Sequence, residues 1–109
     1  MNAYRTAYVY VRNTFAGLLK ETDTGYSFAY DKEYLISANP SAVSLTLPLQ
    51  EEEYLSRTLF PFFDGLIPEG WLLNIVSKNW KISTKDRFGI LLVACKDPIG
   101  NVRIEEELV

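Results

Sequence analysis

The sequence predicts an α+β fold: a small antiparallel sheet, formed by a meander and a closing strand, with about three helices packed on one face. Two observations support this prediction. In the first 50 residues, short β-branched and aromatic segments are separated by turn residues, as in a β-meander. After residue 56, apolar residues recur at three- and four-residue intervals, as in amphipathic helices. Strands and helices that occupy separate blocks of a sequence indicate the α+β class.

The first thirty residues predict three strands. Residues 6–11 are β-branched and aromatic, and Asn13 then favours a tight turn before a second strand over residues 15–20. A Thr-Asp-Thr-Gly turn precedes residues 26–30, which alternate strictly and carry their aromatic side chains on one face.

The next segment is less regular. One helical turn is expected at residues 32–35, and a short alternating strand is expected at residues 43–47, where Pro48 ends it. Glu51, Glu52 and Glu53 follow within a loop that we expect to be solvated, as is the acidic run at residues 105–107.

Three helices and a final strand complete the prediction. Ser56 is a possible cap for a short helix through Phe63, and Pro68 suits the first turn of a second helix that carries residues 71–80. Residues 83–86 have the spacing of a capping box and predict a third helix over residues 84–96. Residues 101–104 are expected to form the closing strand.

Composition restricts the functional classes. The 109 residues suit a single domain spanning 1–109, and the net charge of −3 without a basic cluster argues against direct binding of nucleic acid. No apolar run reaches the roughly 18 residues that a membrane span needs. The single Cys95, interpreted as a buried small hydrophobe, suits a reducing compartment, so a cytoplasmic location is expected.

The chain lacks the residues of common catalytic sites. It has no His and no glycine-rich phosphate loop, and it has no Cys/His set that could hold zinc. Asp64 and Glu69 could in principle share acid and base roles. We favour structural roles for both, at a helix-to-turn junction and at a helix N-terminus. We therefore expect no enzyme activity, no catalytic residue, no metal and no cofactor.

The most informative segment is residues 59–73, where large apolar side chains surround turn residues. Gly65 and Gly70 permit backbone shapes that other residues avoid. Trp71 is either a core residue of the second helix or an exposed anchor for a partner, since Trp is a favoured interface hot spot.

Residues 62–71, Phe-Phe-Asp-Gly-Leu-Ile-Pro-Glu-Gly-Trp, resemble the Phe-Phe-Asp-Gly-Leu-Leu-Pro-Glu-Gly signature in the N-terminal subdomain of HipA-like Ser/Thr kinases. Residues 26–31 are similar to the third strand of that subdomain, and residues 44–49 to its Ser-Leu-Ser-Leu-Pro-Leu segment. The order and spacing agree over nearly the whole chain.

The resemblance implies a HipA N-terminal subdomain-like fold. In the kinases, a core several times longer follows this subdomain, whereas this chain ends at Val109. The resemblance therefore implies a HipS-type component of the tripartite HipB-HipS-HipT toxin–antitoxin systems. The expected partners are a HipT-like Ser/Thr kinase, which the chain would restrain sterically as an antitoxin or accessory component, and a HipB-like helix-turn-helix protein in a ternary complex.

Two alternatives remain open: a non-inhibitory assembly or co-repressor subunit of a DNA-bound HipB-HipS-HipT complex, and the N-terminal fragment of a full-length HipA kinase. The kinase contact is expected in the signature segment, at Phe62, Asp64, Gly65, Leu66, Ile67, Pro68, Glu69, Gly70 and Trp71.

Overall fold

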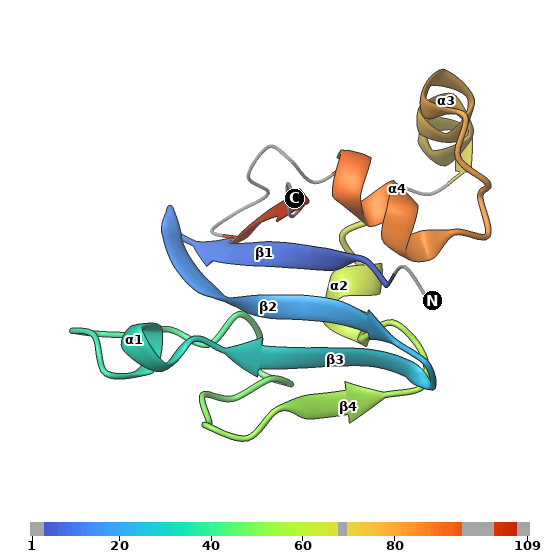
Figure 1. Cartoon of the computed structure of the whole chain (residues 1–109). Coiled ribbons are helices and arrows are strands. Elements are labelled where there is room, and N and C mark those ends of the chain that lie inside the picture. Colours follow the sequence, from blue (N-terminus) through green and yellow to red (C-terminus); the bar gives the residue numbers. More distant parts are fainter. Residues whose placement is uncertain (1–3, 68–69, 95–101, 107–109) are drawn as a thin grey trace.

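The computed structural model describes residues 4–67, 70–94 and 102–106, which form a five-stranded antiparallel sheet with short helices (Figure 1). The sheet order is β4-β3-β2-β1-β5. The strands are β1 (Thr6–Val11), β2 (Thr14–Thr22), β3 (Gly25–Tyr30), β4 (Tyr54–Ser56) and β5 (Val102–Glu106). The predicted α+β class, the meander and the closing strand are confirmed.

The turn between β1 and β2 explains why the meander could be predicted. Arg12 and Asn13 have φ values of 49° and 66°. Positive φ at both central residues is the mark of the type I′ turn, whose twist matches that of a two-strand hairpin. Asn tolerates this conformation well, and Asn13 was the residue that signalled the turn.

The helices are α1 (Lys32–Leu35), α2 (Pro61–Asp64), α3 (Gly70–Trp80) and α4 (Arg87–Ala94). Helices α2 and α4 lie against the sheet, while α3 lies beyond α4 and projects away from the strands (Figure 1). The side chains of Phe63 in α2 and Phe88 in α4 are fully buried, as is that of Phe28 in β3. These rings form the centre of the core between the sheet and the helices.

The predicted strand at residues 43–47 is wrong. Ser44 and Leu47 form only an isolated bridge, which closes a tight turn. The Tyr30 hydroxyl accepts from the Val43 N–H at 3.0 Å and donates to the Leu47 carbonyl, so it holds both sides of the turn. Val43 and Leu47 are buried, whereas Leu45 at the tip is exposed, so the three alternating apolar residues do not share one buried face.

The role expected for Ser56 is also wrong. Ser56 ends the edge strand β4, and its Oγ accepts a hydrogen bond from the Thr58 N–H at 3.3 Å. The short helix begins instead at Pro61, because proline has a fixed φ and no N–H, both of which suit the first helical position. The exposed residues Glu51, Glu52 and Glu53 precede β4, as expected for a solvated loop.

The third helix and the last strand differ from the prediction at their ends. Asp86 lies just before α4 and accepts from the Gly89 N–H at 3.1 Å, so it caps a helix that starts at Arg87, later than expected. Strand β5 includes Glu105 and Glu106, which pair with Tyr8 and Ala7 of β1 instead of forming a solvated tail. Cys95 lies outside the described residues.

Candidate partner-binding surface

Helix α2, the first part of the signature segment, is anchored by aromatic contacts. The buried Phe63 ring packs at 5.4 Å from Phe28 of β3, at 5.2 Å from Phe62 and at 6.3 Å from Phe60, measured between ring centroids. Edge-to-face and tilted arrangements of this kind are favourable beyond the area that they bury. The anchoring fixes the position of the side chains that follow.

Some of the predicted contact residues lie in the core, and others lie at the surface. Phe62 and Leu66 are half-buried and pack against the core, and Ile67 is only 4% exposed. Gly65 is exposed. Pro68 and Glu69 lie outside the described residues. Gly70 and Trp71 begin α3, and the Trp71 side chain is outside the described part of the structure.

Asp64 connects α2 to α4. Its Oδ1 accepts from the Nε of Arg87 at 2.8 Å, in an ion pair whose two side chains are partly exposed. Because α4 packs on the same face of the sheet, this pair holds the end of α2 against the body of the domain. Sequence reasoning placed Asp64 at a helix-to-turn junction, and α2 does end there.

Two shallow hollows lie beside the edge strand β4, and only the larger one also adjoins α2. No sequence motif indicated either of them. The larger, of about 470 Å³, is lined by Tyr26, Arg57, Thr58, Leu59, Pro61, Asp64 and Arg87. The smaller, of about 340 Å³, is lined by Thr24, Tyr26, Leu55, Ser56 and Arg57. Tyr26 and Arg57 line both hollows, so the two lie next to each other, and together we call them the edge hollow.

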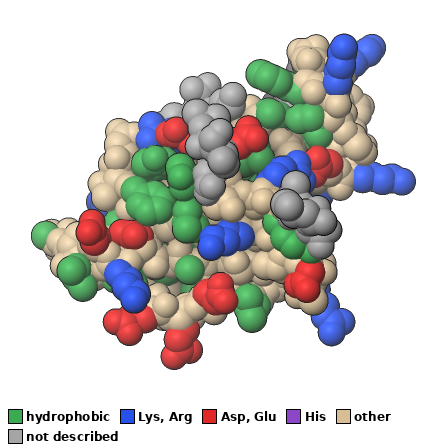
Figure 2. Space-filling view, in the orientation of Figure 1, with side chains coloured by type: hydrophobic (Ala, Val, Ile, Leu, Met, Phe, Trp, Pro, Cys, Tyr) green, Lys and Arg blue, Asp and Glu red, His purple; other side chains and the backbone are tan. Residues whose placement is uncertain are grey.

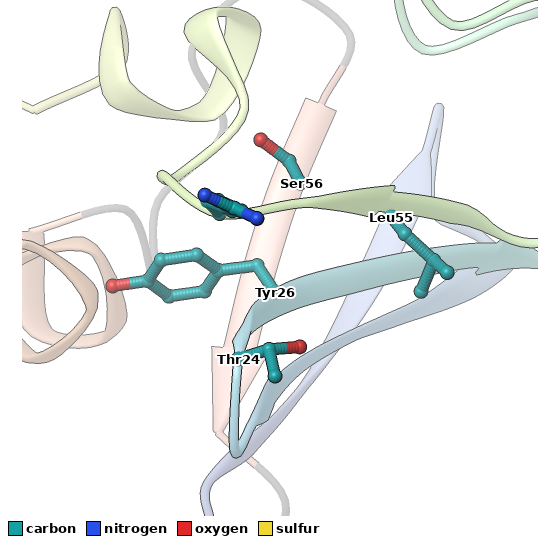
Figure 3. A pocket seen from close by; sticks show the side chains of 5 residues that line it. Thr24, Tyr26, Leu55 and Ser56 are labelled. Carbon is teal, nitrogen blue, oxygen red and sulfur yellow. The ribbon is translucent and has the colours of Figure 1, made fainter.

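Figure 3 shows the smaller of the two hollows. The Tyr26 ring extends from β3, Leu55 extends from β4 in the opposite direction, and Thr24 lies in the turn before β3. Leu55 is 71% exposed, which is unusual for a leucine on a strand. Tyr26 stacks on Phe88 of α4, with ring centroids 6.0 Å apart, and its partial burial raises the pKa of its hydroxyl.

The open face of the sheet carries a second aromatic group. The Phe15 ring lies edge-on to Tyr8 at 5.6 Å and to Tyr10 at 5.9 Å, and the Arg103 guanidinium lies over Tyr10 at 4.3 Å. Figure 2 shows hydrophobic side chains gathered over this part of the sheet. Their mutual contacts leave each ring half-buried.

Among residues 4–67, 70–94 and 102–106, no group of three or more Asp, Glu, Cys or His side chains could hold a metal ion. In the same part of the chain, no helix has the length and apolar character needed to cross a membrane.

Comparison with known proteins identifies the fold and the family. A family model described as the HipA N-terminal domain matches residues 7–105. A solved structure of the N-terminal domain of HipA toxin superposes with a TM-score of 0.75 and 30% identity, covering 99% of this chain and 97% of that chain. An uncharacterised protein of Haemophilus influenzae (strain ATCC 51907 / DSM 11121 / KW20 / Rd) is 35% identical over 103 residues, which are 94% of this chain and 93% of the relative.

These matches are to the N-terminal domain alone, without the kinase catalytic region. The relationship supports a role connected with toxin–antitoxin systems. The chain belongs to the HipA N-terminal domain family.

Proposed function

We propose that this chain binds a HipT-type Ser/Thr kinase in the cytoplasm and restrains it sterically, as an antitoxin or accessory component. The observation that carries the proposal is the match to the HipA N-terminal domain over residues 7–105, which leaves the catalytic region of such kinases outside the match. The Haemophilus relative, 93% of which is covered by the match, is a chain of similar length and supports the existence of this domain without a kinase core.

The surface that best suits this function is the signature segment, residues 62–71. Its first half is held in place because Phe63 and Ile67 are buried, and Phe62 and Leu66 are half-buried against the core. A preorganised apolar segment loses little conformational entropy when it binds a partner. Occupying or propping open a kinase cleft in this way needs no catalytic residue on the binding protein.

The test compares Trp71→Ala with Phe63→Ala. If Trp71 is an anchor for the kinase, Trp71→Ala should melt near the wild-type temperature and weaken binding to a HipT-type kinase by roughly 2–4 kcal/mol, the range of a hot-spot aromatic. Phe63 is fully buried, so Phe63→Ala should lower the free energy of unfolding by roughly 3–5 kcal/mol. Calorimetric binding and thermal melts on the same samples separate the two effects.

Kinase activity and growth rescue complete the experiment. Wild-type protein should lower phosphorylation by the kinase and restore growth, and Trp71→Ala should lose both effects in proportion to its loss of binding. Tight binding without any loss of kinase activity would support the assembly or co-repressor role instead. A Trp71→Ala variant with normal melting and normal affinity would contradict the role given to Trp71.

A further inference from the structure

Arg57 lies at a position that the backbone fixes closely. It follows the edge strand β4, and the Ser56 Oγ accepts from the Thr58 N–H, so a hydrogen-bonded turn encloses it. On the other side, Gly25 begins β3 with a φ of 152°, and a Cβ added there would lie only 2.6 Å from the Cα of Arg57. The absence of a side chain at residue 25 thus allows the Arg57 backbone to pack against the turn between β2 and β3.

The charged groups that line the edge hollow are mainly hydrogen-bond donors, because two arginines accompany one carboxylate. The Arg57 guanidinium has five N–H groups and no acceptor. In the part of the chain that the structure describes, Arg57 makes no ion pair, and the Tyr26 hydroxyl makes no hydrogen bond. Thr58 adds a hydroxyl. Asp64 is the one carboxylate among the lining residues, and it is already paired with Arg87.

The net charge of the residues that line the hollow is positive, whereas the net charge of the whole chain is negative. Two arginines against one aspartate leave one net positive charge among the lining residues, whereas the whole chain carries −3. An excess of donors with a positive charge is complementary to a carboxylate, and an arginine fork binds a carboxylate with two parallel hydrogen bonds. The exposed Leu55 beside Arg57 offers an apolar contact to a residue adjacent to that carboxylate.

We propose that the edge hollow binds an acidic side chain, Asp or Glu, of the partner protein, with Arg57 as its ion-pair partner and Leu55 as the adjoining apolar contact. This inference rests on the proposed function, because the partner is the HipT-type kinase. Pro61 and Asp64 of α2 line part of the hollow. An acidic residue of the kinase bound there would therefore lie next to the kinase contact proposed for the signature segment.

The main test is the charge of Arg57. Arg57→Gln should raise the Kd for the HipT-type kinase roughly tenfold, and Arg57→Glu should raise it further because it places like charges together. Lys20→Gln is the matched control, since Lys20 is an exposed cation on β2 outside the hollow. The salt dependence gives a second readout: between about 50 mM and 300 mM NaCl, wild-type affinity should fall more steeply than that of Arg57→Gln.

Leu55→Ser tests the apolar contact. Leu55 is mostly exposed, so the variant should keep the wild-type melting temperature, and its Kd for the kinase should rise several-fold. Ile36→Ser provides the matched control, because Ile36 is 85% exposed and follows α1, outside the residues that line the hollow. Equal affinities of the Leu55 and Ile36 variants would remove Leu55 from the site.

The outcomes distinguish this inference from the proposed function. Normal kinase affinity in Arg57→Gln, with affinity lost in Trp71→Ala, would overturn the acidic-residue site and leave kinase binding intact. If wild-type protein does not bind the kinase, the proposed function fails. The hollow itself is then judged by titrating the ¹⁵N-labelled chain with sodium acetate.

In that titration, saturable shifts of the Arg57 Nε and of neighbouring amides, absent in Arg57→Gln, would retain a carboxylate site. Unsaturable or uniform shifts would reject it. A parallel titration with sodium phosphate identifies the preferred anion, and clearly tighter binding of phosphate than of acetate would overturn the assignment to Asp or Glu.

Discussion

Among Gly17, Gly25, Gly65 and Gly89, Gly25 has the least room for a side chain. Its φ of 152° lies in the region that L-residues rarely adopt, and an added Cβ would lie 2.1 Å from the Ser56 carbonyl oxygen. Gly65 differs: its φ is −67°, and the nearest atom to an added Cβ is the Pro61 carbonyl oxygen at 3.2 Å.

We therefore expect Gly25→Ala to lower the free energy of unfolding by roughly 2–4 kcal/mol, through strain and overpacking together. Gly65→Ala should change it by less than about 1 kcal/mol. Urea denaturation of the two variants beside wild type checks both values. A Gly25→Ala protein as stable as Gly65→Ala would show that β4 can move away from the turn at little cost.

At the scale of residues, the sequence was most informative where a side chain has a local role. Phe63 was predicted to lie in a short helix and does so in α2, and Asn13 was predicted to lie in a tight turn and has positive φ. Arg57 and Tyr26 carried no signal, because the edge hollow forms only when β3, β4, α2 and α4 come together. A hollow lined by residues from four separate elements leaves no short motif in the sequence.

At the scale of elements, one arginine connects the beginning of β1 to β2 and α4. Arg5 donates from its Nε and Nη2 to the Glu21 carboxylate at 2.7 and 3.0 Å, and from its Nη1 and Nη2 to the Asp86 carboxylate at 3.0 and 2.7 Å. The hydrogen bonds from Arg5 lower the pKa of Glu21 and the pKa of Asp86 below their ordinary values. Asp86 is also the cap of α4, so the network stabilises the docking of that helix.

This network predicts a pH dependence of stability. Because both carboxylates have lower pKa values in the folded state than in the unfolded state, their contribution is fully present above the unfolded-state pKa values, which are about 4, and is lost as the pH falls through the lower folded-state values. Arg5→Gln should lower the free energy of unfolding at pH 7 by about 1–2 kcal/mol, a range reduced by the partial exposure of the pair. The variant should also lose less stability than wild type on acidification.

Urea denaturation at a series of pH values, with Lys20→Gln as the control, measures both effects. Parallel pH curves for wild type and Arg5→Gln would contradict the role of Arg5. The control should follow wild type, because Lys20 is exposed and takes no part in the network.

Among the elements, the sequence predicted those whose pattern is local and failed where tertiary contacts decide. Strand β1 and helix α1 have the predicted bounds. A β-branched and aromatic run marks β1, and in the structure the Asp31 side chain caps α1 by accepting from the Tyr34 N–H. Strand β4 was missed, since its three residues follow an acidic loop and pair only with the edge of β3. Residues 43–47 had the pattern of a strand but form a turn held by the Tyr30 hydroxyl, an interaction that alternation alone cannot reveal.

At the scale of the whole molecule, stability is unevenly distributed. The sheet and α4 share fully buried side chains, whereas α3 projects beyond α4 and has exposed residues at Asn74, Lys78 and Trp80 (Figure 1). Leu73 is only partly buried where it packs against the core. With 11 residues, α3 is shorter than the roughly 12–15 residues at which isolated helices become even marginally stable in water.

We therefore expect α3 to open locally more easily than the rest of the fold. Backbone amides of residues 73–80 should exchange with deuterium at least about tenfold faster than those of β1, β2 and β3, because local opening needs less free energy than global unfolding. The opposite result, protection in α3 equal to that in the sheet, would mean that α3 unfolds only with the whole domain.

Deuterium exchange measured on the complex with a HipT-type kinase tests whether α3 takes part in binding. Since α3 begins at Gly70 within the signature segment, binding of a HipT-type kinase there should slow exchange in residues 73–80 while leaving the already protected β2 unchanged. Trp71→Ala should abolish that slowing at equal protein concentrations, because less complex forms. Slowed exchange confined to the open sheet face around Tyr8, Tyr10 and Phe15 would instead place the kinase contact on the other side of the sheet.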